Sequence, residues 1–114
     1  MHNRREDVSR LPTREPPGAV RDSAFVYILA CADGWLYVGH AMNVAKRLAE
    51  HGGPKGAKFT VDHPGARLVY VEGPLSEELA IKRERQLKGW SRAKKLALIT
   101  NQVVRLSELS QSRD

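Results

Sequence analysis

Apolar and polar positions along the chain predict three strands and three helices after a polar beginning. Residues 24–31 are continuously apolar and rich in aromatic and β-branched types, which is typical of a strand buried on both faces. The Asp33-Gly34 pair predicts a tight turn, because both residue types adopt positive φ at low cost. Strand character resumes over residues 35–39, so we expect an antiparallel hairpin. A third strand is predicted over residues 66–72.

Polar capping residues followed by apolar positions at helical spacing predict the helices. Asn43 is the expected N-cap of a helix that runs to about residue 51. Ser76 is the expected N-cap of a second helix, which runs to residue 88 and has acidic residues in its first turn. A third helix is predicted over residues 91–100.

The remaining segments divide the chain into one domain with two tails. Residues 1–22 are rich in proline and charge and poor in apolar side chains, so we expect a disordered N-terminal tail. Residues 23–100 form the expected domain, and residues 101–114 a short C-terminal helix and tail. Residues 52–65 make a long connection rich in glycine, proline and lysine, which is a candidate substrate-contacting loop.

Composition excludes several classes of protein. An apolar fraction of 41% argues against wholesale disorder, and no apolar run reaches the ~18 residues that span a membrane. The charged N-terminus is unlike a secretory signal, so a cytoplasmic location is expected. The lone Cys31 cannot form an internal disulfide, and the four histidines lack metal-ligand spacing. No phosphate-binding glycine loop or nucleophile elbow is present.

The net charge of +6 is concentrated in residues 82–95, which hold seven cations and the single anion Glu84. A solvated helix face is the ordinary interpretation of such a run. The run is too one-sided for ion pairs at i,i+4 to explain it, so we favour a surface that faces nucleic-acid phosphates. The seven cations are Lys82, Arg83, Arg85, Lys88, Arg92, Lys94 and Lys95.

Glu84 is an acid on the apolar side of the second helix. Ala80 lies four residues before it and Leu87 three after, so the three side chains share one face. A desolvated carboxylate is costly unless it meets a cation or a metal. Two interpretations follow: a buried ion pair with Arg47 or a neighbour, or a ligand of a divalent metal.

Two tripeptides on the predicted hairpin, Phe25-Val26-Tyr27 and Tyr37-Val38-Gly39, introduce a family resemblance. Three further segments agree with it in order: Ala45-Lys46-Arg47-Leu48 with Glu50-His51, Gly56-Ala57-Lys58-Phe59-Thr60, and residues 83–92. Together they resemble the GIY-YIG nucleases, in particular a small bacterial single-domain branch similar to the nuclease domain of Slx-type endonucleases. The resemblance covers about residues 24–99. Phe25 departs from the glycine of the first motif, and no RING-type cysteine cluster is present.

The resemblance implies an α+β fold, with a three-stranded antiparallel sheet flanked by helices. It implies an endonuclease that hydrolyses DNA phosphodiester bonds with one divalent metal, Mg²⁺ or Mn²⁺. Branched, nicked or single-stranded DNA of repair or recombination is the implied substrate, and a monomer is favoured. The alternative is a nucleic-acid-binding module of the same fold whose catalysis is weak or lost.

The resemblance also assigns the site residues. Tyr27 matches a proposed base or water-orienting group, and Tyr37 the group that positions the nucleophile or scissile phosphate. Arg47 matches an arginine that stabilises phosphate charge, Glu84 the metal ligand, and His51 a supporting polar residue. A tyrosine with its ordinary pKa of ~10 is a poor base at neutral pH. We expect Arg47, Lys46 or the metal to lower that pKa. Lys46 and Lys58 join the expected DNA contacts.

Overall fold

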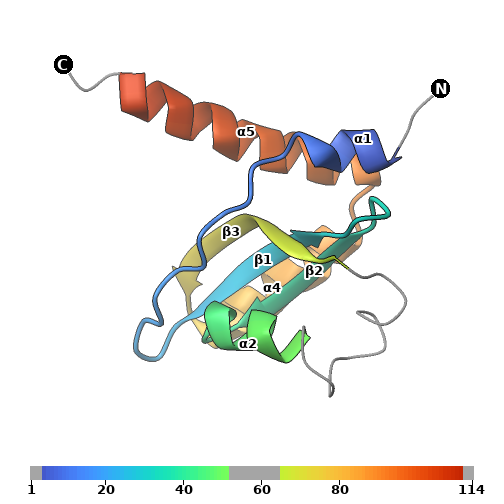
Figure 1. Cartoon of the computed structure of the whole chain (residues 1–114). Coiled ribbons are helices and arrows are strands. Elements are labelled where there is room, and N and C mark those ends of the chain that lie inside the picture. The colour runs from blue at the N-terminus through green and yellow to red at the C-terminus, as the bar shows by residue number, and fades with distance from the viewer. Residues whose placement is uncertain (1–3, 52–64, 112–114) are drawn as a thin grey trace.

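A three-stranded antiparallel sheet with the strand order β2-β1-β3 lies among the helices (Figure 1). The computed structural model describes residues 4–51 and 65–111, with side chains described for residues 4–50 and 65–102. The α+β class expected from the sequence is confirmed. The elements are α1 (Arg4–Ser9), β1 (Ala24–Ala30), β2 (Leu36–Ala41), α2 (Val44–His51), β3 (Arg67–Leu75), α4 (Glu77–Lys88) and α5 (Arg92–Gln111).

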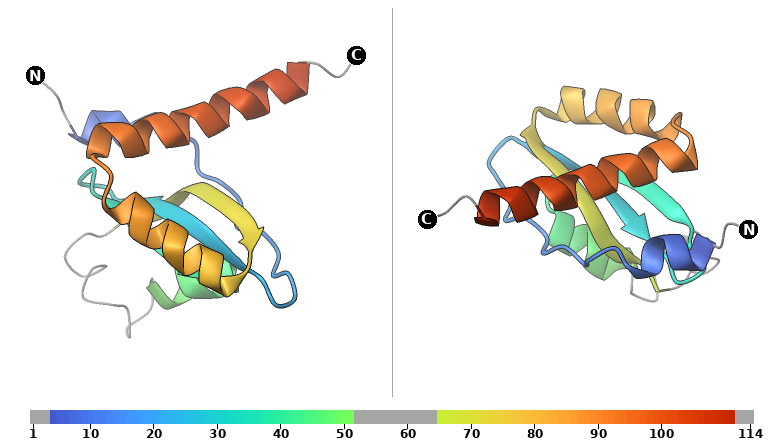
Figure 2. Two further views of the ribbon diagram at one scale, coloured as in Figure 1. Left: turned by 180° about the vertical axis from the view of Figure 1, so that it is seen from behind. Right: turned by 90° about the horizontal axis from the view of Figure 1, so that it is seen from above.

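The central strand β1 is buried along its whole length, as the apolar run predicted. Its side chains alternate between two faces. Val26 and Ile28 belong to a core shared with α1, α4 and α5, whereas Tyr27 and Leu29 belong to a core shared with α2. Helices α2 and α4 therefore cover opposite faces of the sheet (Figure 2).

Both predicted N-caps are confirmed. The Asn43 side-chain oxygen accepts a hydrogen bond from the backbone N–H of Lys46 at 3.1 Å. The Ser76 hydroxyl accepts one from the N–H of Leu79 at 3.2 Å. Each bond satisfies a donor that the first helical turn leaves without an intrahelical partner. The caps place the starts of α2 and α4 at the positions that the sequence indicated.

Strand β3 extends past its predicted end at residue 72. It pairs again with β1 at Ala24↔Leu75, after register shifts that mark irregular pairing. Gly73 has φ +141°, and a Cβ there would lie 2.7 Å from a ring carbon of Phe25. Because β3 is an edge strand, the proline that follows does not remove a central ladder bond. The strand therefore continues where the Gly73-Pro74 pair predicted a stop.

The N-terminal segment is ordered from residue 4, which corrects the expected disordered tail. Val8 of α1 is buried in the core, and Leu11 packs against it. The Arg67 guanidinium donates to the backbone carbonyls of Val8 and Leu11, and the Arg14 N–H donates to the Leu68 carbonyl at 2.7 Å. Two apolar side chains and these bonds hold a segment whose composition alone argued for disorder.

Arg92, at the start of α5, joins three parts of the chain. It donates to the carbonyl of Gly34 at 2.6 Å and to the carbonyl of Arg4 at 3.1 Å. Its Nε atom lies 3.6 Å from an Asp7 carboxylate oxygen, and its side chain is only 21% exposed. The side chain expected to contact nucleic acid is thus used to fasten α1 and the β1–β2 turn to α5.

Helix α5 continues to Gln111, whereas the sequence predicted a stop near residue 100 and a separate short helix after it. Thr100 and Asn101, at the predicted stop, lower helix propensity without breaking a helix. No glycine or proline occurs between residues 92 and 111. With no breaker in that stretch, the two predicted helices form one.

The contacts of Arg92 predict a large stability loss on truncation. Arg92→Ala removes a charged donor from two carbonyls and leaves Asp7 without it, so we expect a loss of about 2 kcal/mol in the free energy of unfolding. For a domain of this size the melting temperature then falls by roughly 5 °C. Urea and thermal unfolding measure both quantities.

Arg85→Ala is the matched control, because Arg85 is an exposed arginine on α4. Its loss should change stability by less than about 0.5 kcal/mol. Equal losses for the two variants would contradict the fastening role of Arg92.

Candidate active site

The proposed catalytic side chains meet at β2, an edge strand of the sheet. Tyr27 on β1 lies opposite Gly39 on β2, and Tyr37 packs in the same core on the α2 side. His40, which follows Gly39 on β2, lies opposite Val26, whose side chain faces α4. Side chains from the two faces of the sheet therefore come together along the β2 edge.

The Tyr27 ring extends from β1 over Gly39 of the neighbouring strand β2. A Cβ at Gly39 would lie 2.7 Å from the Tyr27 hydroxyl oxygen and 2.8 Å from the ring carbon that bears it. Real Cβ atoms essentially never approach so closely, so only glycine leaves room for this ring position. The glycine of the second tripeptide thus directs the first-motif tyrosine toward the edge of the sheet.

The Tyr27 hydroxyl is buried and has no hydrogen-bond partner of regular geometry among the described residues, but the Arg47 guanidinium lies close enough to act on it as a hydrogen-bonding group. Burial raises the pKa of this phenol to about 12, and Tyr37 adds to the rise. Arg47 acts in the expected direction and lowers the pKa, but burial outweighs it. The expectation of a lowered pKa is therefore wrong for this structure, and Tyr27 is neutral at ordinary pH.

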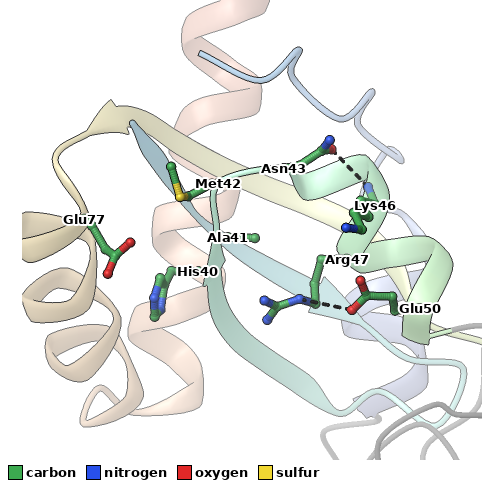
Figure 3. Close-up of a pocket in the computed structure, with 8 residues that line it drawn as sticks. All are labelled: His40, Ala41, Met42, Asn43, Lys46, Arg47, Glu50 and Glu77. Atoms are coloured by element: carbon green, nitrogen blue, oxygen red, sulfur yellow. Dashed lines mark hydrogen bonds and ion pairs between the residues drawn. The ribbon is translucent and has the colours of Figure 1, made fainter. Parts of the chain in front are cut away.

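Arg47 projects from α2 toward β2 beside a hollow of about 360 Å³. In Figure 3, Arg47 and Lys46 lie on the α2 side of β2, whereas His40 and Glu77 lie on its α4 side. The Nε atom of Arg47 is 3.7 Å from a Glu50 carboxylate oxygen, and the side chain remains substantially exposed. An exposed guanidinium in this position can reach an anion that enters the hollow.

Glu84 projects from α4 toward the same edge. Ala80 and Leu87 are fully buried, as their spacing from Glu84 predicted. One carboxylate oxygen of Glu84 lies 3.2 Å from Nδ1 of His40, and the other lies 3.7 Å from the Lys88 ammonium. The sequence left open an ion pair of Glu84 with Arg47 or a neighbour. The partners observed are the neighbours His40 and Lys88.

Three of these side chains lie near enough to Tyr27 to act on its pKa. Tyr37 and Glu84 both raise it, and Arg47 lowers it. The structure therefore brings Tyr27, Tyr37, Arg47 and Glu84 together. The side chain of His51, at the end of α2, and the whole of Lys58 lie outside the described residues.

His40 is a site residue that the sequence interpretation did not assign. It directly follows the Tyr37-Val38-Gly39 tripeptide on β2. Because side chains alternate along a strand, the residue after Gly39 points to the face opposite Tyr27, where α4 lies. Strand alternation, combined with the position of Glu84 on that helix, is the signal that identifies it.

The cations of residues 82–95 divide into two groups: arginines that pack the helices, and cations that lie mostly at the surface. Arg83 forms hydrogen bonds of 3.0–3.2 Å with Glu72 and lies 5.3 Å from the Trp90 ring, so it packs the end of α4 as Arg92 packs α5. The Lys94 ammonium lies 4.4 Å from the Trp90 ring. We call the other cations of the run, together with Lys46, the basic surface: the exposed Lys82, Arg85, Lys88 and Lys94, and the half-buried Lys95.

Comparison with known proteins finds one family. Residues 23–97 match the GIY-YIG catalytic domain. A UPF0213 protein from Staphylococcus aureus (strain Mu3) is 45% identical over 78 residues, which cover 68% of this chain and 95% of that protein. One from Natronomonas pharaonis is 42% identical over 78 residues, covering 68% and 92%. The solution NMR structure of a Bacillus halodurans UPF0213 protein is 38% identical and covers 68% of this chain and 83% of that one, with a TM-score of 0.46.

The close approach of Gly39 and Tyr27 predicts that Gly39→Ala destabilises the protein. The new methyl group forces the buried ring to move, and overpacking of this kind costs about 1–3 kcal/mol. Chemical unfolding measures the loss, and the near-ultraviolet spectrum of the tyrosines reports the displaced ring.

Gly18→Ala is the control, since nothing lies within 4 Å of a Cβ at that position. It should leave stability unchanged or raise it by less than about 1 kcal/mol. A Gly39→Ala protein as stable as the wild type would show that the ring does not occupy this position.

Proposed function

The chain belongs to the GIY-YIG catalytic domain family, and from this membership we propose that it is a metal-dependent endonuclease that hydrolyses DNA phosphodiester bonds. The observation that carries the proposal is the convergence of the buried Tyr27 with the partly exposed Arg47 and Glu84 at one edge of the sheet. A phenol, a guanidinium and a carboxylate are the side chains that this chemistry requires there.

Phosphodiester hydrolysis needs a water in line with the leaving oxygen and positive charge at the phosphate. Arg47 presents a planar set of donors that matches phosphate oxygens. With its pKa raised to about 12, Tyr27 is proposed to orient the attacking water through a neutral hydroxyl rather than to act as a phenolate. Tyr37, which packs in the same core, is proposed to position the scissile phosphate.

Glu84 and its surroundings fit a divalent metal. Its carboxylate is 18% exposed and faces an imidazole nitrogen, and oxygen and nitrogen donors of this kind bind such ions. No group of three or more metal-binding side chains occurs among the described residues, so a metal here would take ligands from water and substrate as well. A bound Mg²⁺ or Mn²⁺ would supply positive charge and Lewis acidity. His51 is proposed to support this site from the end of α2.

The basic surface is proposed to hold the DNA backbone. Most of its cations lie on α4 and the start of α5, whereas Lys46 lies on α2, and phosphate contacts of this kind need no base sequence. Lys58, which lies outside the described residues, is proposed to join them.

None of the described helices is long and apolar enough to span a bilayer. A single site in a monomer implies that one strand is cut per encounter, which suits nicked, branched or single-stranded DNA.

The alternative is a binding module of the same fold with lost catalysis. Burial of a hydroxyl without a hydrogen-bond partner lowers stability. The Tyr27 hydroxyl is buried without a partner of regular geometry among the described residues, with Arg47 as the group that acts on it and with Gly39 leaving room for its ring. A module that only bound DNA would gain nothing from this arrangement, so catalysis is favoured.

Nicking of a supercoiled plasmid tests the function. With Mg²⁺ or Mn²⁺ present, the wild-type protein should relax the plasmid, and Glu84→Ala should lower the rate about 100-fold or more, because the metal ligand is lost. Glu78→Ala removes an exposed carboxylate from the same helix and should leave the rate unchanged. A Glu84→Ala rate equal to the wild-type rate contradicts the proposed site.

Tyr27→Phe should separate activity from stability. Removal of a buried hydroxyl without a hydrogen bond of regular geometry should change the free energy of unfolding by no more than about 1 kcal/mol. The nicking rate should fall about 100-fold, because the water loses the group that orients it. Denaturant unfolding and the plasmid assay measure the two effects on the same preparation.

Tyr70→Phe is the matched control, because the Tyr70 hydroxyl donates to Glu72 at 2.6 Å. It should lose about 1–2 kcal/mol of stability and keep its nicking rate.

The ratio of the wild-type to the Tyr27→Phe rate should stay constant from about pH 6 to about pH 9, since a phenol with a pKa of about 12 remains neutral there. A ratio that rises steadily with pH would instead identify Tyr27 as an ionising base.

A further inference from the structure

His40 and Glu84 face one another from two different elements at the edge of the sheet. His40 comes from β2 and Glu84 from α4, and Nδ1 of the imidazole lies 3.2 Å from Oε2 of the carboxylate. The side chains are 29% and 18% exposed, so water and small ions reach both. The pair is built by packing of α4 against the sheet rather than by a local sequence motif.

The separation of these two atoms suits a shared metal ion. Divalent ions bind imidazole nitrogen and carboxylate oxygen at about 2.1 Å. Two such ligands at right angles around one ion lie about 3 Å apart, which is close to the observed 3.2 Å. A metal could therefore replace the hydrogen bond between His40 and Glu84 with little movement of either element.

We propose that His40 is a second protein ligand of the metal held by Glu84, an inference that rests on the metal site of the proposed function. An imidazole in the ligand set changes which ion is preferred. Mg²⁺ favours oxygen ligands, whereas Mn²⁺ and Co²⁺ also accept imidazole nitrogen. The chain should therefore bind Mn²⁺ and Co²⁺ more tightly than Mg²⁺.

Lys88 opposes metal binding in the free protein. Its ammonium lies 3.7 Å from the other carboxylate oxygen of Glu84 and competes for the same negative charge. Removal of this cation in Lys88→Gln should strengthen the binding of Mg²⁺ and Co²⁺ alike. His40→Gln should act differently, because it removes a nitrogen donor and affects mainly the ion that accepts nitrogen.

Metal titration of the full chain without DNA tests the proposal. Co²⁺ binding is followed by its visible absorption, which depends on the ligand atoms, and Mg²⁺ binding by competition. His40→Gln should lower the Co²⁺ affinity about tenfold or more and change the absorption spectrum, but lower the Mg²⁺ affinity less than about twofold. The difference spectrum between wild type and His40→Gln removes the contribution of the other histidines.

Two further variants calibrate the titration. Glu84→Gln should weaken both ions, since it removes the shared carboxylate. Glu78→Gln removes an exposed carboxylate from the same helix and should weaken neither. A His40→Gln protein with the wild-type Co²⁺ affinity and spectrum overturns the proposal, as does a wild-type protein that binds no Co²⁺.

The titration is independent of the plasmid assay, so the two ideas fail separately. Plasmid nicking with Mg²⁺, together with an unchanged Co²⁺ spectrum in His40→Gln, would retain the endonuclease and reject the histidine ligand. A Co²⁺ site that depends on His40, in a protein that cuts no DNA, would retain the ligand and reject the endonuclease.

Discussion

Burial of β1 on both faces is the constraint on which the rest of the structure depends. A strand in this position needs a cover on each side, and α2 supplies one while α1, α4 and α5 supply the other. The two covers come from distant parts of the chain. Their residues can meet only at the edges of the sheet, beyond the buried strand.

The candidate site occupies the β2 edge for this reason. Tyr27 comes from the buried strand itself and reaches the edge because Gly39 has no side chain. Arg47 arrives with the helix on one face and Glu84 with the helix on the other. The same burial that positions Tyr27 raises its pKa, so its place in the core keeps the phenol neutral at ordinary pH.

The concentrated positive charge serves both stability and surface chemistry. Arg83 and Arg92 are partly buried and are held by Glu72 and by backbone carbonyls. Their planar guanidinium groups suit several acceptors at once. Three lysines of the same run, Lys82, Lys88 and Lys94, are exposed, where long flexible ammonium groups keep their hydration. Charge counting along a sequence does not distinguish the two groups, because it omits the partners that each cation finds.

The sequence by itself determined the number and order of the strands, the caps of α2 and α4, and the residues of the two tripeptides, because these depend on local spacing and on capping by near neighbours. It placed Ala80 and Leu87 with Glu84 on one helix face for the same reason. Only the tertiary structure decided that His40 meets Glu84, that Arg92 fastens α1, and that the Tyr27 pKa rises. Each of these depends on contacts between residues far apart in the chain and on the burial that such contacts create.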